Sequence, residues 1–295
     1  MDLIQVGEKT YYIKNNTNIG VYKINDTDVF LIDSGNDKDA GRKILKIINE
    51  QGWSVKGIIN THSNADHIGG NKFIQDRTNC DIFAYNIEKS FTQYPVLEPS
   101  FLYGGYPFKG IRNKFLLAKT SDTKDIKNNL PDGLEVFELK GHFFDMIGIR
   151  TSDDVIFLAD SLFSEDTIEK YHLFFIYDVK EYLNTLDFLS TVQGKLYIPS
   201  HCQVTDDISN LIQTNKNKIY EIAGKIYDVC ENEMTFEDIL KYIFDAYNLV
   251  MNANQYVLIG STIRSYLSYL CDENKLCYEF KDNRMIWKQV TDCGE

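Results

Sequence analysis

One short loop concentrates the residue types that bind metal ions. Residues 61–70 read THSNADHIGG and hold two of the five histidines, His62 and His67, together with Asp66. Imidazole nitrogen and carboxylate oxygen are the usual ligands of a hydrolytic zinc site, which keeps one coordination position open for water. Asn64 stands where a third imidazole would fit. The loop therefore predicts a metal site whose completeness depends on residue 64.

Three further candidate ligands follow short apolar runs that have the composition of strands. They are His142 after residues 134–139, Asp160 after 155–159 and His201 after 195–199, and residues 55–60 (VKGIIN) lead into the first loop in the same way. Strands hold their ends rigidly, so ligands from several strand ends can converge on one point. A lone histidine after a strand is more often structural than a ligand, but four of the five histidines follow this rule. The aspartate that ends VIFLAD also needs a cation or several donors, because an unpaired buried carboxylate is costly.

The predicted secondary structure that must position these residues changes once along the chain, from strands with a helix to a mainly helical pattern. Strands are predicted at 18–24 and 29–33 and a one-faced helix at 37–52. From residue 206 the pattern turns helical, and Thr235 with Asp238 resembles a capping box. The predicted elements beyond that point are helices at 206–230, 235–247 and 256–271 and strands at 275–278 and 285–290. Two domains are therefore predicted, 1–205 and 206–295.

The ordered motifs His62-x-Asn64-x-Asp66-His67, Gly141-His142, Ala159-Asp160 and Ser200-His201 resemble the metallo-β-lactamase superfamily over roughly residues 1–205. The resemblance implies a four-layer αββα sandwich of the mixed α/β class with the metals at one edge. It implies one metal held by His62 and His142, a second held by Asp66, His67 and His201, and Asp160 between them. It also implies that Asp33 supports the site from behind the ligands. Asp33 has an alternative reading as a turn or helix-capping residue.

The departure from the family pattern is Asn64, which offers a neutral oxygen in place of imidazole. We expect the second metal position to bind tightly and the first to bind weakly. Zinc is the expected metal, with one or two ions, while iron or manganese are alternatives because hard oxygen ligands favour them. A site that has lost its activity is a third reading.

The implied activity is hydrolysis by a metal-activated water, with Asp66 placed to orient the water or accept its proton. The substrate implied is a small ester, thioester, lactone or related molecule. The alternatives are an RNA or DNA phosphodiesterase of the same fold and a non-catalytic metal-binding protein. Residues 206–295 resemble the winged-helix appendage of some relatives, but they carry 9 Lys and Arg against 15 Asp and Glu. That balance, within a net charge of −12, argues against nucleic acid as a partner and leaves packing, a lid or a homodimer as roles.

The remaining expectations concern location and substrate contacts. No apolar run is long enough for a membrane span, and six scattered cysteines predict reduced thiols in a cytoplasmic protein. The aromatic stretch 94–108 is expected to be a loop that either lines a pocket mouth or caps the core. Three cations follow it and either neutralise an anionic substrate or lie in solvent: Lys109, Arg112 and Lys114. His172 matches no motif and is expected to be structural.

Overall fold

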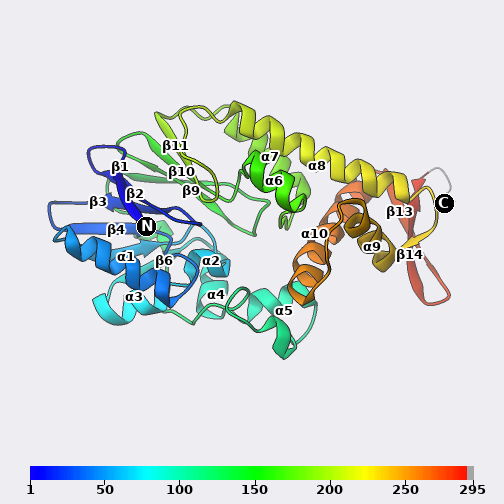
Figure 1. Cartoon of the computed structure of the whole chain (residues 1–295), viewed down its shortest axis with the longest axis horizontal. Coiled ribbons are helices and arrows are strands. Elements are labelled where there is room, and N and C mark those ends of the chain that lie inside the picture. The colour runs from blue at the N-terminus through cyan, green and yellow to red at the C-terminus, as the bar shows by residue number, and fades with distance from the viewer. Residues whose placement is uncertain (291–295) are drawn as a thin grey trace.

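The computed structural model describes residues 1–290, and Figure 1 shows an elongated molecule with a mixed sheet-and-helix part at one end and a mainly helical part at the other. The strands are β1 (Asp2–Gln5), β2 (Thr10–Lys14), β3 (Ile19–Lys23), β4 (Asp28–Ile32), β5 (Ser54–Ile59), β6 (Asp81–Ala84), β7 (Lys124–Asp125), β8 (Leu134–Glu138), β9 (Ile147–Thr151), β10 (Val155–Ala159), β11 (Leu196–Pro199), β12 (Met234–Thr235), β13 (Leu276–Lys281) and β14 (Arg284–Gln289). The helices are α1 (Lys38–Glu50), α2 (Ala65–Ile68), α3 (Asn71–Thr78), α4 (Glu88–Gln93), α5 (Leu97–Tyr103), α6 (Glu165–Tyr171), α7 (Val179–Leu189), α8 (Ser209–Val229), α9 (Phe236–Ala246), α10 (Ala253–Asp272) and the 3₁₀ turns η1 (Lys109–Ile111) and η2 (Ile126–Asn128).

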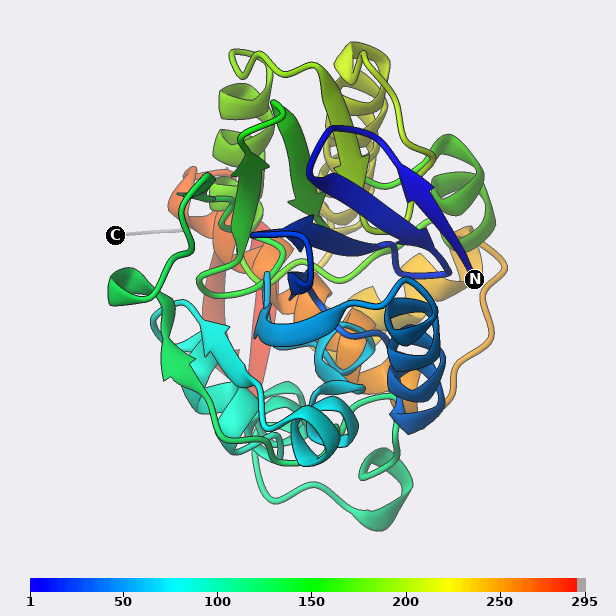
Figure 2. The ribbon, with the colours of Figure 1, turned by 90° about the vertical axis from the view of Figure 1, so that its left-hand side faces the viewer.

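Two sheets form the sandwich, and Figure 2 shows them from the end. One is seven-stranded in the order β1-β2-β3-β4-β5-β6-β7, and the other is four-stranded in the order β11-β10-β9-β8. Strands β1 to β4 pair antiparallel, whereas β4, β5, β6 and β7 pair in parallel. Parallel neighbours need a crossover, which α1 supplies between β4 and β5 and α3 between β5 and β6, both on the outer face of the seven-stranded sheet.

Strand β10 of the four-stranded sheet is buried on both faces, and its sequence shows how this is achieved. Its residues Val155 and Phe157 belong to the apolar cluster between the two sheets, while Ile156 and Leu158 belong to the cluster beneath α7 and α8. Side chains alternate between the faces of a strand, so a strand covered on both sides must be apolar throughout. The run VIFLA meets that requirement.

The outer face of the seven-stranded sheet is covered by α1 in the same way. Ile44 and Ile48 of α1 cluster with Leu31 of β4 and Ile58 of β5. Asp37 begins the helix by accepting hydrogen bonds from the backbone of the first turn. Helices therefore cover both outer faces of the paired sheets, and the predicted four-layer αββα fold is confirmed.

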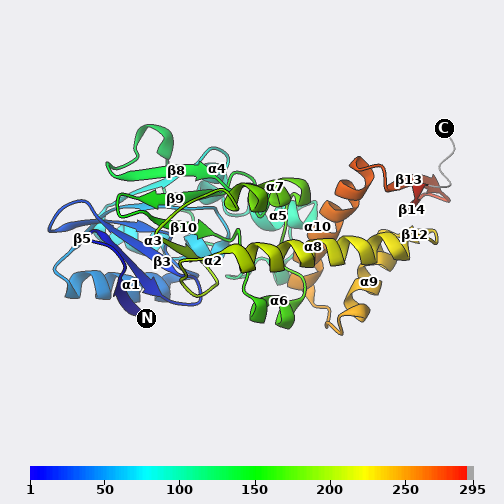
Figure 3. The ribbon, with the colours of Figure 1, turned by 90° about the horizontal axis from the view of Figure 1, so that it is seen from above.

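Beyond the sandwich, α8 extends to a small three-stranded sheet of order β12-β14-β13, as Figures 1 and 3 show from two directions. The predicted capping box forms at the start of α9, between Thr235 and Asp238. One apolar cluster joins Leu158 of β10 to Ile263 and Tyr266 of α10. The C-terminal helices therefore share the core of the sandwich, and the division at residue 205 and the winged-helix comparison stay predictions.

Two expectations need correction. The stretch 94–108 is not simply a loop, because residues Leu97–Tyr103 form α5. Cys277 is disulfide-bonded, so the prediction of reduced cysteines is wrong at this position, although four others are free: Cys80, Cys202, Cys230 and Cys271. Within residues 1–290, none of the helices has the length and apolar character of a membrane span.

Candidate metal centre

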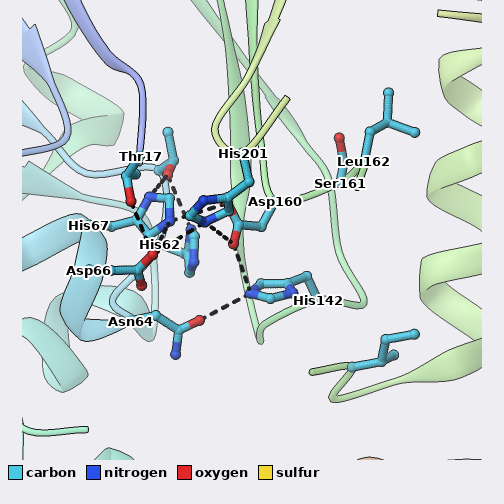
Figure 4. Close-up of polar contacts among 12 residues, drawn as sticks. Thr17, His62, Asn64, Asp66, His67, His142, Asp160, Ser161, Leu162 and His201 are labelled. Carbon is cyan, nitrogen blue, oxygen red and sulfur yellow. Dashed lines mark hydrogen bonds and ion pairs between the residues drawn. The ribbon is translucent and has the colours of Figure 1, made fainter. Parts of the chain in front are cut away.

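Four strand ends bring all six predicted ligands to one edge of the sandwich, where Figure 4 shows them gathered. His62 follows β5, and Asp66 and His67 lie on α2. His142 follows β8, Asp160 follows β10 and His201 follows β11. The backbone is distorted where Asp160 is delivered: Ala159 has a φ of 49°, in the left-handed region. Non-glycine residues in that region cost of the order of 1–3 kcal/mol and cluster at functional sites.

The first cluster consists of Asp66, His67, Asp160 and His201. His201 Nε2 lies 3.2 Å from Asp66 Oδ2 and 3.1 Å from Asp160 Oδ2. His67 Nε2 lies 3.2 Å from Asp160 Oδ1. One ligand atom of each residue falls within 4.8 Å of the others. Two imidazoles and two carboxylates around one point are a donor set suited to a divalent metal.

The second cluster consists of His62, His142 and Asp160, again with ligand atoms within 4.8 Å of one another. Asp160 belongs to both clusters, and its Oδ2 lies 3.6 Å from His142 Nε2. Asn64 Oδ1 lies 3.1 Å from the same His142 nitrogen. Asn64 therefore stands beside the second cluster, at the position where the sequence lacks an imidazole.

Several potential ligand atoms at this edge have no hydrogen-bond partner within residues 1–290. They are Nε2 of His62, Nε2 of His67, Nδ1 of His142 and Oδ1 of Asp160; all four are buried, and the 3.2 Å contact between His67 Nε2 and Asp160 Oδ1 lacks hydrogen-bond geometry. A buried polar atom without a partner costs about 1–3 kcal/mol, so native proteins rarely leave several together. A metal ion in each cluster would satisfy His62 Nε2, His67 Nε2 and Asp160 Oδ1, and the residues therefore fit the group that the motif implies.

Other residues orient the imidazoles from behind. Asp33 Oδ2 lies 2.8 Å from His67 Nδ1, and Asp33 also accepts hydrogen bonds from the backbone and hydroxyl of Thr61. His201 Nδ1 lies 2.9 Å from the carbonyl oxygen of Asn16. A carboxylate or carbonyl at Nδ1 leaves Nε2 as the ligand atom. Both contacts aim Nε2 into the first cluster.

Burial and nearby carboxylates shift the pKa values of the four candidate histidine ligands in opposite directions. Burial lowers the pKa of His62 and of His142, so these imidazoles are held neutral, the form that binds metal. Burial also acts against a protonated His67, but the carboxylates of Asp160, Asp66 and Asp33 outweigh it and raise its pKa well above the usual value. Burial is likewise outweighed by Asp160 and Asp66 at His201, whose pKa is raised. A metal ion would take the place of these two protons.

Two buried carboxylates that the sequence analysis missed lie behind the loop. Glu98 of α5 accepts a hydrogen bond from Asn64 Nδ2 at 2.7 Å, and Glu88 of α4 accepts from the backbone of Ser63 at 3.0 Å. Burial raises the pKa of Glu98 well above its usual value and that of Glu88 to about 7. The sequence offered one signal, because Glu98 is the sole acidic residue within YPVLEPSFLY.

The other residues singled out from the sequence lie elsewhere. Lys114 pairs with Asp37 at 3.0 Å, and Arg112 donates to the hydroxyl of Tyr106. His172 ends α6 and stacks on Tyr247 with ring centroids 4.7 Å apart, a contact that fits the structural role expected for it.

Comparison with known proteins identifies the family. The model of the metallo-β-lactamase superfamily matches residues 13–201, which hold every predicted ligand. The chain belongs to the metallo-β-lactamase superfamily. A β-lactamase domain protein from Burkholderia ambifaria has the same fold, with a TM-score of 0.75 at 15% identity over 98% of this chain and 93% of that one. That similarity includes the C-terminal helices as well as the sandwich.

Two curated relatives of this superfamily chain are named hydroxyacylglutathione hydrolase. The protein from Prochlorococcus marinus (strain MIT 9312) is 24% identical over 154 residues, which are 50% of this chain and 54% of the relative. The protein from Rhodopseudomonas palustris (strain BisB18) is 29% identical over 122 residues, which are 41% of this chain and 39% of the relative. The chain thus spans about half or less of the length of the relatives that it matches.

Proposed function

We propose that this superfamily member is a metal-dependent hydrolase that cleaves a small ester, thioester, lactone or related substrate with water. The observation that carries the proposal is the group of buried, unpartnered imidazole and carboxylate atoms at the sheet edge. The names of the curated relatives, which are hydrolases, support the reaction class. A bound divalent metal supplies a water whose pKa is lowered to about 7 and polarises the substrate carbonyl.

The ligand assignment is part of the proposal. We assign His62 and His142 to one ion, Asp66, His67 and His201 to another, and Asp160 to both, because these residues form the two clusters described above. Zinc fits the imidazole-rich donor sets, and iron or manganese are alternatives. Asn64 offers the ion assigned to His62 and His142 only a neutral amide oxygen, so we expect that ion to be held more weakly.

Asp66 is assigned the proton-handling role. Its side chain is 37% exposed, whereas that of Asp160 is 6% exposed, so water reaches Asp66 more readily. Thr17 donates a hydrogen bond to Asp66 Oδ2 at 3.2 Å and fixes the orientation of the carboxylate. A held carboxylate beside the site can orient the attacking water and accept its proton.

Elemental analysis combined with a substrate panel tests the proposal, using wild type, Asp160→Ala and Asn64→His. After dialysis we expect one tightly held ion in the wild type and a second one in Asn64→His, because the new imidazole completes the weak set. Asp160→Ala should lose metal and hydrolysis together, since both clusters share this residue. Retention of metal and activity in Asp160→Ala would refute the site assignment, and two equally tight ions in the wild type would refute the asymmetry.

The panel also separates the other two function classes. A phosphodiesterase would cleave bis(p-nitrophenyl) phosphate and bind RNA in a salt-sensitive manner, which the acidic C-terminal segment argues against. A non-catalytic protein would melt at a lower temperature without metal and hydrolyse none of the compounds.

A further inference from the structure

The cavity over the candidate metal centre indicates what substrate it accepts. Its volume is about 370 Å³, and its floor holds Asn64, Asp66, His142 and Asp160. A cavity of that size suits a small-molecule substrate, since such sites span roughly 300–1,000 Å³. Because the floor is the candidate metal centre itself, the residues of the walls determine which substrate fits.

The walls are largely apolar and come from three separate parts of the chain. One wall is the 163–175 segment with Phe163, Leu173 and Phe175, and another is formed by residues 115–116. The third comes from the C-terminal segment, which contributes Leu249, Val250, Leu258 and Ile259. The C-terminal helices therefore do more than pack on the sandwich, because they complete the pocket over its metal-binding edge.

The cavity has no lysine or arginine among its lining residues. Of its three acidic residues, Asp66 and Asp160 belong to the candidate metal centre, and burial favours the neutral form of Glu98 by raising its pKa. Lys114, the cation nearest in sequence to the wall residue Phe115, is engaged by Asp37 at 3.0 Å. A glutathione thioester carries two carboxylates, and beyond the metal centre no lysine or arginine of the lining would pair with them.

Apolar side chains at the mouth of the cavity are exposed to solvent. Val250 is 83% exposed, Phe115 57% and Tyr171 51%, and all three line the cavity. Exposed apolar groups gathered at a pocket mouth mark a binding surface, because covering them contributes about 25 cal/mol per Å² of apolar area. An apolar chain that leaves the pocket would cover these side chains.

We propose that the substrate is an uncharged ester or thioester with an apolar acyl chain, and that the C-terminal wall around Val250 and Leu258 selects that chain. This inference rests on the proposed hydrolase activity. The reaction adds the hydroxyl of water to the acyl carbon, breaks the bond from that carbon to sulfur or oxygen, and places the remaining proton on the leaving thiol or alcohol. No further reactant is needed.

Matched thioesters test the charge and the chain separately. S-octanoyl-N-acetylcysteamine and S-octanoylglutathione share the acyl group and differ in the leaving thiol, which is small and neutral in the first and a charged tripeptide with two carboxylates in the second. The acetyl and octanoyl cysteamine thioesters differ only in chain length. For the metal-loaded wild type we expect kcat/KM to be roughly tenfold higher for the neutral octanoyl compound than for either of the others. Equal or higher kcat/KM for octanoylglutathione, or no effect of chain length, would overturn the inference.

The variant Val250→Asp tests the wall without disturbing the core, because this side chain is mostly exposed. We expect roughly tenfold lower kcat/KM for the octanoyl cysteamine thioester and a change of less than about twofold for the acetyl one. Val290→Asp is the matched control, since Val290 is 40% exposed and is not among the residues that line the cavity. An equal loss on both thioesters would contradict the assignment of the wall.

A binding measurement keeps this inference separate from the hydrolase proposal. 2-Decanone carries an apolar chain and a carbonyl but has no bond that water can cleave. If no ester or thioester is hydrolysed, calorimetric binding of 2-decanone that weakens in Val250→Asp supports the apolar pocket while the hydrolase proposal fails. Absence of 2-decanone binding to the wild type would overturn the pocket assignment itself.

Discussion

Asn64 is the residue in which this site differs from the pattern of its superfamily. It stands at the N-cap of α2, where an asparagine normally accepts a backbone hydrogen bond, yet its side chain makes no capping contact. Its amide nitrogen instead donates to Glu98, which turns the oxygen towards His142. The side chain is therefore positioned by the tertiary structure to face the second cluster, with a weaker ligand atom than imidazole.

Asp33 provides a second prediction at the scale of single residues. We expect Asp33→Asn to weaken metal binding about 10- to 100-fold, because the amide removes the negative charge that faces His67 Nδ1. Asparagine tolerates the left-handed conformation of residue 33, whose φ is 65°, so the backbone is preserved. Competition with a chromophoric chelator measures the affinity.

Asp154→Asn is the matched control for that measurement. Asp154 is also left-handed, with a φ of 62°, but it lies at the β9–β10 turn and pairs with Arg150. We expect its metal affinity to equal that of the wild type. Unchanged affinity in Asp33→Asn would mean that Asp33 serves only the turn, the alternative reading of the sequence.

Among the elements, the short helices α4 and α5 both support the loop that carries the first candidate ligands. Each sends one buried glutamate to the 61–64 loop, and Glu88 of α4 also accepts from the backbone of Asp145 in the loop before β9. Glu88 therefore ties two ligand-bearing loops together. The cost is a buried carboxyl group whose pKa burial raises to about 7 from its usual 4.5.

That pKa predicts how stability depends on pH. Between about pH 4.5 and 7 the folded protein keeps the Glu88 proton while the unfolded chain loses it, so the free energy of unfolding falls as pH rises through this window. Above the Glu88 pKa of the folded protein, the free energy of unfolding is lower by about 3 kcal/mol than below pH 4.5. We expect Glu88→Gln to flatten this slope, measured by urea unfolding with excess chelator at several pH values.

Glu135→Gln is the control for this experiment, because Glu135 is an exposed residue of β8. Its slope should match that of the wild type. If Glu88→Gln keeps the same slope, Glu88 does not hold its proton in the folded protein. A uniform offset in stability is expected in addition, because the amide group introduced by Glu88→Gln would turn one N–H towards the backbone donor of Ser63 or of Asp145.

Across the whole molecule, the site joins parts that are distant in sequence. Its ligands come from the seven-stranded sheet through β5 and from the four-stranded sheet through β8, β10 and β11. The C-terminal helices add a wall of the pocket. A metal ion bound here therefore holds the two sheets together at one edge and binds the folded chain in preference to the unfolded one.

Metal removal should accordingly lower the melting temperature. A ligand at 100 times its Kd stabilises the folded state by about 2.7 kcal/mol. For a chain of 295 residues this corresponds to a shift of about 4 °C, which calorimetry with and without EDTA would measure. Asp160→Ala should not respond to EDTA, because both clusters lack their shared residue. An unchanged wild-type melting temperature would contradict tight metal binding in the protein as prepared.

The sequence by itself determined the fold class and the position of every candidate ligand. Strand periodicity and apolar runs depend on local residue order, and VIFLA can be buried on both faces only as a central strand. Asp160 follows such a run directly, and His62, His142 and His201 follow strands within four residues, so their positions near strand ends are a local property. The capping box at Thr235 was predictable for the same reason.

Only the tertiary structure decided which groups meet those ligands. Glu98 lies 34 residues from Asn64, and the wall residue Val250 is further still along the chain, so no local pattern indicates either contact. The orientation of the Asn64 amide and the raised pKa of Glu88 depend on burial by segments that only folding brings together. The largely apolar pocket, whose lining has no lysine or arginine, likewise forms only after the C-terminal helices pack against the edge of the sandwich.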